Sequence, residues 1–244
     1  MSRVFRKFRL KQIGGKPSRK YLAYAIGEIM LIVIGLLLAI QINNFQEGIK
    51  NDKKRDNYYR LLITDLESDI QQIEKVKESI SEQLKLIENF ESRLNLDEGS
   101  KEEIVAIAKN EFNPNLPNFV RYQLGTIETL KATGDLSLIE GDILEGIGEL
   151  QALQSEQIYY LDAGLKARAS ILEKYMTHFP IKKGVIHQGE LFNLFWNAQE
   201  VKEIALQLNA LLTMEKGMLS NASNYYDKIL IRTRKIIDSI KDKT

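Results

Sequence analysis

Hydrophobic and polar positions divide the chain into three kinds of sequence. The first is a run from Ile29 to Ile40 that contains twelve consecutive residues without a polar side chain. In the second kind, apolar residues recur every three or four positions, over about 45–95, 139–179 and 198–242. The third kind consists of polar breaks rich in Asn, Gly and Pro. A spacing near 3.6 predicts amphipathic helices. We therefore expect an all-α protein in which an N-terminal membrane helix continues into a bundle of about three long helices and some short ones.

The apolar run is too short to cross a membrane by itself. Twelve helical residues span roughly 18 Å, whereas the hydrocarbon core of a bilayer is about 30 Å thick. Extension to residues 21–42 gives a sufficient length but encloses Glu28, and it places Tyr21 and Tyr24 where aromatic rings favour the membrane interface. The expected organisation is a basic tail over 1–20, a transmembrane helix over 21–42 and a helical bundle over 43–244.

A cleaved signal peptide is the alternative interpretation of this run. Such peptides end in a small-residue cleavage site, and Ala39-Ile40-Gln41 matches that pattern poorly. The chain contains no cysteine, so a lipid-modified cysteine and disulfide bonds are excluded. The sequence therefore favours an uncleaved signal-anchor.

The distribution of charge predicts the orientation of this anchor. Residues 1–27 carry eight Lys and Arg and no acid, which leaves 26 basic and 33 acidic residues from Glu28 onward. A basic arm can bind nucleic acid, but one that adjoins an apolar run favours a membrane surface instead. Because cytoplasmic loops are enriched in Lys and Arg, we expect an inner-membrane, single-pass protein with a cytoplasmic N-terminus. The bulk of the chain would be periplasmic.

One face of the expected membrane helix combines an acid with two small residues. At 100° per residue, Gly35 and Ala39 lie within about 20° of Glu28, and Met30 lies on the opposite side. Small residues four apart let two membrane helices approach closely, and a carboxylate in a span usually faces protein or water. The face of Glu28, Gly35 and Ala39 is thus a candidate packing surface. In the alternative interpretation, the Glu28 side chain reaches the lipid headgroups and Gly35 has no role in helix packing.

An aromatic cluster occupies the break before the last long helix. Similar helix lengths predict antiparallel packing, in which the first long helix leaves the membrane, the second returns and the third leaves again. Residues 180–197 would then lie near the bilayer. We therefore expect Phe192, Phe195 and Trp196 at the membrane-proximal end of the bundle, either in contact with lipid or a partner or packed in the core.

Two stretches resemble a known family. The first comprises Tyr24–Ile29 and Ile34–Asn44, which reads IGLLLAIQINN, and the second is Thr129–Ile139, which reads TLKATGDLSLI. Both are similar to a family of uncharacterised bacterial single-pass membrane proteins, a domain of unknown function. That family has Asn-Asn-Trp after the span, where this chain has Asn44-Phe45. The resemblance implies a single-pass protein with a helical exterior and supplies no activity.

Candidate chemistry is sparse. The two histidines, His178 and His187, lack the i, i+4 spacing of helical metal ligands, and no phosphate-binding loop or G-x-S-x-G motif is present. We expect no catalytic, cofactor or metal site. The leading hypothesis is a non-enzymatic interaction or scaffold module whose partners are the lipid bilayer and either a second copy or another membrane protein. The alternative is an extracytoplasmic sensor that binds a ligand between helices and signals through a membrane partner.

Overall fold

The computed structural model describes residues 19–95, 101–182 and 184–243. Its elements are α2 (Arg19–Leu94), α3 (Lys101–Ala106), η1 (Ile107–Glu111), α4 (Gly125–Thr133), η2 (Asp135–Leu138), α5 (Gly141–His178), α6 (Gly189–Asn197) and α7 (Val201–Lys241). Within these described ranges there is no strand, and α2, α5 and α7 are the three long helices. The all-α fold predicted from the periodicity is confirmed.

Helix α2 joins the apolar run to the first amphipathic stretch without interruption. This continuity was predicted, because the sequence contains no proline between Arg19 and Leu94. The chain nevertheless divides into two units, residues 1–56 and residues 57–244. In this division Asn57 is the first residue of the unit that contains the bundle. The expected boundary at residue 43 stays a prediction. Most of the expected basic tail, residues 1–18, lies outside the described residues.

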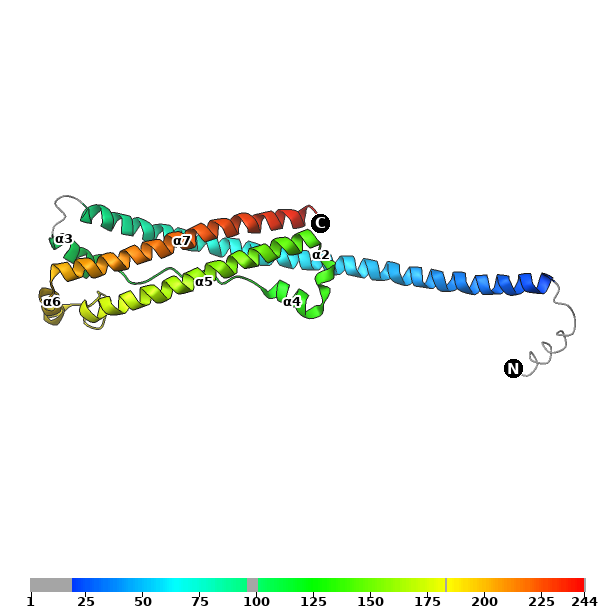
Figure 1. Ribbon diagram of the computed structural model, residues 1–244, viewed down its shortest axis with the longest axis horizontal. Helices are drawn as coiled ribbons and strands as arrows, with labels where there is room; N and C mark the ends of the chain where they lie inside the picture. Colours follow the sequence, from blue (N-terminus) through cyan, green and yellow to red (C-terminus); the bar gives the residue numbers. More distant parts are fainter. Residues whose placement is uncertain (1–18, 96–100, 183, 244) are drawn as a thin grey trace. The chain divides into compact units, whose positions relative to one another are not determined.

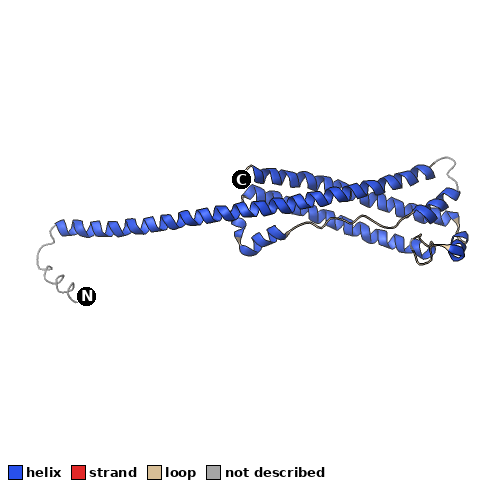
Figure 2. Ribbon diagram, turned by 180° about the vertical axis from the view of Figure 1, so that it is seen from behind, coloured by secondary structure: helices blue, strands red, loops and turns tan. Residues whose placement is uncertain are grey.

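The three long helices of the second unit lie side by side (Figures 1 and 2). Ion pairs between α2 and α7 show how the two helices run relative to one another. From one pair to the next, the residue number on α2 decreases while the residue number on α7 increases. The pairs are Glu91–Lys216 at 2.5 Å, Lys77–Asp227, Glu74–Arg234 at 2.9 Å and Glu67–Lys241 at 3.7 Å. Helix α7 is thus antiparallel to α2, and the pairs Glu149–Arg232 and Arg168–Glu215 make α5 antiparallel to α7.

It follows that α5 runs parallel to α2, which contradicts the predicted up-down-up order. The cause is the segment 112–124 between η1 and α4. It is extended, and both views show it running along the helices toward α4 (Figures 1 and 2). Pro114 and Pro117 prevent a helix there. At about 3.3 Å per residue, thirteen residues cover roughly 40 Å and return the chain to the Asn57 end of the bundle.

The changed order moves the aromatic cluster. The rings of Phe179 and Trp196 stack with centroids 5.8 Å apart, and Lys109 donates a hydrogen bond to Asn193 at 2.9 Å. Phe192, Phe195 and Trp196 therefore lie at the Leu94 end of the bundle, whereas the up-down-up order would have put them at the Asn57 end. Phe192 and Trp196 are buried, as the core-packing alternative predicts, whereas Phe195 is exposed.

Apolar residues at helical spacing fill the core of the bundle. On α2 they are Tyr59, Leu62, Leu66, Ile73, Ile80, Ile87 and Phe90. The middle of α5 departs from this pattern, because the polar side chains of Gln154 and Gln157 are buried, whereas Ile158 is exposed. The positions run 147, 150, 154, 157 and 161 in steps of three and four, so polar side chains occupy core positions.

Candidate functional site

The apolar part of α2 presents bare hydrophobic side chains. Every side chain described between Tyr24 and Ile42 is exposed, including Leu31 and Leu36. By length and composition α2 is a candidate membrane span, and its apolar window is near the N-terminus. Apolar side chains on all sides of a helix need an apolar surrounding. The structure therefore agrees with the sequence on the existence of one candidate span.

The face of Glu28, Gly35 and Ala39 lies within this exposed part. A Cβ atom added to Gly35 would meet nothing within 4 Å. Helical geometry brings the three residues onto one face, as expected, and no other described segment covers it. The face is sterically open to a second helix. Its role in association remains a prediction.

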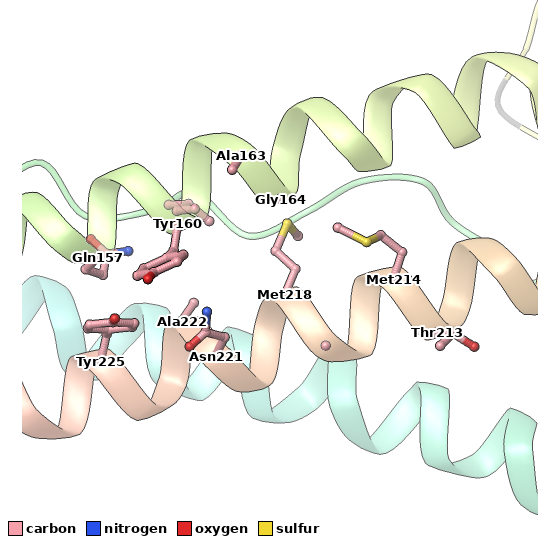
Figure 3. Close-up of a pocket in the computed structure, with 12 residues that line it drawn as sticks. Gln157, Tyr160, Ala163, Gly164, Thr213, Met214, Met218, Asn221, Ala222 and Tyr225 are labelled. Carbon is pink, nitrogen blue, oxygen red and sulfur yellow. The ribbon is translucent and has the colours of Figure 1, made fainter.

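A groove of about 460 Å³ lies between α5 and α7 (Figure 3). Its walls include Gln157, Tyr160, Gly164, Met214, Met218 and Tyr225, and no charged side chain is among the lining residues. The rings of Tyr160 and Tyr225 stack with centroids 5.8 Å apart. Gly164 brings the helices together, because a Cβ atom there would lie 2.8 Å from Cγ of Met218. Gly217 leaves open space in the wall.

Gln157 lies at one end of the groove and is only 2% exposed (Figure 3). Its Oε1 accepts a hydrogen bond of 3.1 Å from the Tyr122 hydroxyl, and its Nε2 has no hydrogen-bond partner among the described residues. Burial raises the pKa of the nearby Tyr226, and the Gln157 amide partly opposes that rise. The geometry between the two side chains is nevertheless not that of a hydrogen bond. Nε2 is itself buried and does not open into the groove.

A buried ion pair ties the middle of the bundle together. Nε of Arg168, which is 5% exposed, donates to Oε2 of the fully buried Glu215 at 2.9 Å. The other Glu215 oxygen accepts from Gln83 of α2 at 2.8 Å, and Arg168 Nη2 donates to the Pro114 carbonyl at 2.6 Å. Both charges are therefore hydrogen-bonded, which a buried pair requires. These three hydrogen bonds join α2, α5, α7 and the extended segment.

The sequence interpretation missed this pair, although a signal was present. The apolar steps of the last long helix skip from Leu211 to Met218, and those of α5 skip from Leu165 to Leu172. Glu215 and Arg168 fill these gaps at core spacing. Opposite charges in the gaps of two apolar stripes are a usable indication of a buried pair.

Two aspartates of α2 hold the start of α4. Asp69 accepts a hydrogen bond from the Gln123 backbone N–H at 2.9 Å, and Asp65 accepts from that of Thr126 at 3.1 Å. Burial raises the pKa of Asp69 to about 6, against the effect of the Gln123 hydrogen bond and with help from the nearby Asp65 charge. These carboxylates satisfy backbone donors at a helix start, so their arrangement serves structure.

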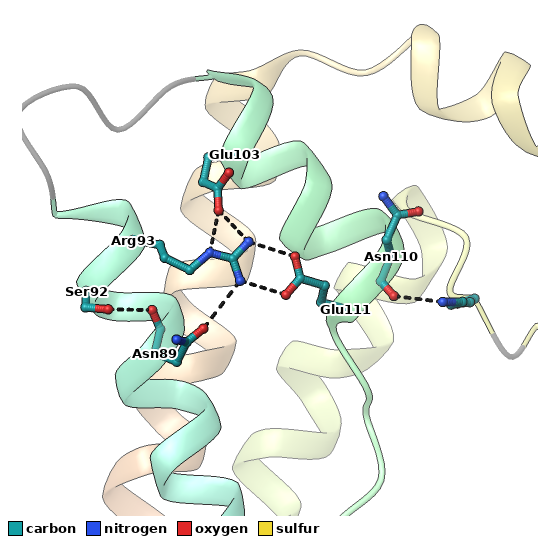
Figure 4. A network of polar contacts seen from close by, with 7 residues as sticks. Asn89, Ser92, Arg93, Glu103, Asn110 and Glu111 are labelled. Carbon is teal, nitrogen blue, oxygen red and sulfur yellow. Dashed lines mark hydrogen bonds and ion pairs between the residues drawn. The ribbon is translucent and has the colours of Figure 1, made fainter.

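A polar network fastens the Leu94 end. Arg93 lies between Glu103 of α3 and Glu111 of η1 (Figure 4). Its two Nη atoms donate to the two Glu111 oxygens at 2.7 and 2.8 Å, a fork geometry that is among the stronger charged contacts. The hydrogen bonds to Glu111 and Glu103 raise the pKa of Arg93, and that to Arg93 lowers the pKa of Glu111. The network holds the short helices against the end of α2.

The histidines lie on the surface, as expected. His178 and His187 are exposed, and each Nδ1 pairs with a backbone carbonyl of its own segment, Lys174 and Gly184, both at 2.9 Å. No group of three or more potential metal ligands occurs in the part of the chain that the structure describes.

These geometries can be compared with known proteins. Residues 28–140 match DUF6090, a family of unknown function. No curated protein and no solved structure matches the chain. The matched residues contain Ile34–Asn44 and Thr129–Ile139, which supports the resemblance as one to a family of unknown function.

The DUF6090 region covers the apolar part of α2 and the segment that returns along the bundle. Its second resembling stretch contains Gly134, whose φ of 75° ends α4 in a conformation that favours glycine. Asp135 then accepts a hydrogen bond of 2.7 Å from the Tyr58 hydroxyl, so this stretch is fixed to the first turn of the bundle. The α5–α7 groove lies beyond residue 140 and outside the match.

Proposed function

We propose that the protein is a non-enzymatic interaction or scaffold module, anchored by residues 21–42 in the inner membrane of a bacterium. The observation that carries the proposal is the exposed apolar run of α2, which no other described segment covers. The basic residues before the run support a cytoplasmic N-terminus and a periplasmic bundle. The Glu28, Gly35 and Ala39 face is the surface through which the anchor would associate with a second copy or another membrane protein.

A pair of substitutions tests association. Gly35→Leu blocks close backbone approach on the proposed face, whereas Met30→Leu is a nearly volume-conserving change on the opposite side and serves as the control. We expect Gly35→Leu to weaken self-association in a bilayer assay and co-purification of a partner from mild detergent, and Met30→Leu to leave both unchanged. If both variants associate as the wild type does, the face is not an association surface.

Reporter fusions after Thr244 test the orientation. A periplasmic reporter enzyme is expected to be active there and a cytoplasmic fluorescent reporter to be silent. The reverse result would reverse the topology. Residues 57–244 alone are expected to be soluble, helical and without turnover. Turnover that a single carboxylate substitution abolishes would contradict the non-enzymatic part of the proposal.

The groove between α5 and α7 favours a second candidate function. In this version the bundle is a sensor that binds a ligand between its helices and signals through a membrane partner. A concave, mainly apolar surface with a few polar side chains, here including Gln157, Thr213 and Asn221, is the usual form of a small-molecule site. The feature that separates the two functions is ligand binding at this groove.

A further inference from the structure

Helix α6 exposes one apolar face while it buries another. Phe192 and Trp196 are buried, whereas Leu191, Leu194 and Phe195 are 48%, 63% and 41% exposed. At 100° per residue the three exposed side chains share one face of the helix. A helix that is apolar on more than one face is normally covered on each of them, and the described part of the chain leaves this second face of α6 uncovered.

The connection before α6 extends this apolar surface. Val185 is fully exposed and Ile186 is also exposed. Trp196 Nε1 donates a hydrogen bond of 3.2 Å to the Pro180 carbonyl, which ties the connection to α6. Figure 1 shows α6 at the same end of the bundle as α3. We define the tip surface as the five exposed apolar residues of this end, which are Val185, Ile186, Leu191, Leu194 and Phe195.

The tip surface lies far from the point where the chain enters the bundle. The chain arrives from the proposed anchor at Asn57, and α2 then runs to Leu94 at the end where the tip surface lies. At 1.5 Å per residue the two ends of this stretch are roughly 55 Å apart. A partner at the tip surface therefore meets the end of the bundle opposite Asn57.

Charge distinguishes the tip from the bundle as a whole. Residues 28–56 carry four basic and four acidic residues, so the 26 basic and 33 acidic residues from Glu28 onward leave 22 and 29 for residues 57–244. Between Glu173 and Glu190, by contrast, the chain carries three lysines, two histidines and no acid. The bundle is thus acidic overall, and the segment that leads into α6 is basic.

Lysines border the tip surface in the fold as well. Lys182 is exposed, and its Nζ donates to the Asn110 carbonyl at 3.2 Å. Lys109 Nζ lies 5.5 Å from the centre of the Phe192 ring. Two acids of α3 and η1, Glu103 and Glu111, are paired with Arg93. The border of the tip surface is therefore suited to a negatively charged partner.

Apolar side chains bordered by lysines are the usual features of a surface that lies on a membrane. The apolar groups enter the boundary between headgroups and acyl chains, and the lysines reach anionic headgroups. We propose that the tip surface docks on an anionic lipid bilayer other than the one that holds residues 21–42. The acidic remainder of the bundle favours end-on docking, because anionic lipid repels its sides. The inference rests on the proposed anchor for which bilayer is meant, and it does not depend on the Gly35 face.

Nanodiscs and vesicles test the docking with the full chain. The protein is placed in nanodiscs of uncharged phosphatidylcholine and mixed with sucrose-loaded vesicles of two parts phosphatidylcholine to one part phosphatidylglycerol. Centrifugation measures the fraction of nanodiscs that sediments with the vesicles. We expect saturable sedimentation with these vesicles and much weaker sedimentation with vesicles of phosphatidylcholine alone. Lys182→Gln should weaken docking about fivefold, the usual effect of one lysine at an anionic surface.

Two double variants separate docking from a general change of charge. Leu194→Glu with Phe195→Glu removes two apolar side chains from the tip surface, and we expect vesicle affinity to fall at least about tenfold. Leu61→Glu with Ile231→Glu is the matched control, because both residues are exposed, at 45% and 70%, and lie on α2 and α7 away from the tip. It should dock as the wild type does. All four positions are exposed, so neither variant should lower the melting temperature.

Three results would overturn the proposal. The first is wild-type protein that does not sediment with anionic vesicles, and the second is equal docking of the two double variants. The third is pairing of nanodiscs without vesicles that only the tip variant abolishes, which would identify a second copy as the partner. Gly35→Leu is expected to dock as the wild type does, so failure of the tip surface and failure of the proposed association face are distinguishable.

Discussion

The two halves of α2 are both α-helical, but they differ in the pattern and the burial of their side chains. Between residues 24 and 42 apolar side chains surround the helix and all described ones are exposed. Between residues 57 and 94 they form one stripe, which is buried, while charged residues occupy the other side. In both halves, hydrogen bonds within the helix satisfy the backbone N–H and C=O groups. The side chains differ because one half is suited to a uniformly apolar surrounding and the other to protein on one side and water on the other.

The bundle also contains polar groups that an apolar span excludes. Asp69, Gln157, Arg168 and Glu215 are buried in it. We hypothesise that the Arg168–Glu215 pair fixes how the helices align, because its hydrogen bonds reach Gln83 and Pro114 as well. Uniform apolar stripes would permit shifts by one heptad that these bonds prevent.

Removal of one partner of the buried pair should have the largest effect on the bundle. Arg168→Met leaves the Glu215 carboxylate buried without its counter-charge, and we expect a loss of about 3–5 kcal/mol in the free energy of unfolding. Urea titration of residues 57–244 measures this. The double variant Arg168→Met, Glu215→Leu should recover most of the loss. If the single variant is as stable as the wild type, the pair does not hold the bundle.

One substitution in each half of α2 should have separate effects. Ile80 is fully buried, so Ile80→Ala is expected to lower the free energy of unfolding of the bundle by about 2–4 kcal/mol without changing membrane insertion. Leu36→Arg should oppose insertion by about 2.5–3.5 kcal/mol without changing the urea midpoint of the bundle. The protein fraction recovered with membranes measures insertion. An effect of Leu36→Arg on bundle unfolding would contradict the division into two units.

Asp69 should give the bundle a smaller, pH-dependent change. Its pKa is raised by burial from 3.8 to about 6, so between these values the folded state binds more protons than the unfolded state. Stability therefore falls as pH rises through this window, on the order of 1–2 kcal/mol after allowance for screening. Asp69→Asn should reduce the slope measured by urea titration between pH 4 and pH 7. The exposed control Asp162→Asn should keep the wild-type slope.

Local sequence signals predicted the long helices well, but they did not predict the direction in which α5 runs relative to α2. The helical spacing placed both ends of α5 and α7, and the C-terminal end of α2, within three residues of their observed bounds. The error arose at residues 112–124, since Pro114 and Pro117 exclude a helix but do not distinguish a tight turn from an extended segment. That difference is decided by distant contacts, such as the Gln123 N–H to Asp69 and the Pro114 carbonyl to Arg168.

The two candidate sites also differ in how far the sequence could predict them. Glu28, Gly35 and Ala39 share one face through helical geometry alone, so the sequence could place them together. The groove requires Tyr160 of α5 and Tyr225 of α7 to meet. Their meeting depends on the antiparallel register of the two helices, which single-helix periodicity does not contain.

The most direct measurement of the central claim, a membrane anchor joined to a separate water-facing bundle, uses the absence of native cysteine. Leu36 and Leu61 are both exposed leucines of α2, at 62% and 45%. Each is replaced by cysteine in an otherwise complete chain, and a membrane-impermeant maleimide is applied to proteoliposomes. The account predicts that cysteine at position 61 reacts on the outward-facing fraction of molecules, and that cysteine at position 36 reacts only after the bilayer and the protein are dissolved in denaturant. Equal reaction at the two positions in intact proteoliposomes would contradict the account.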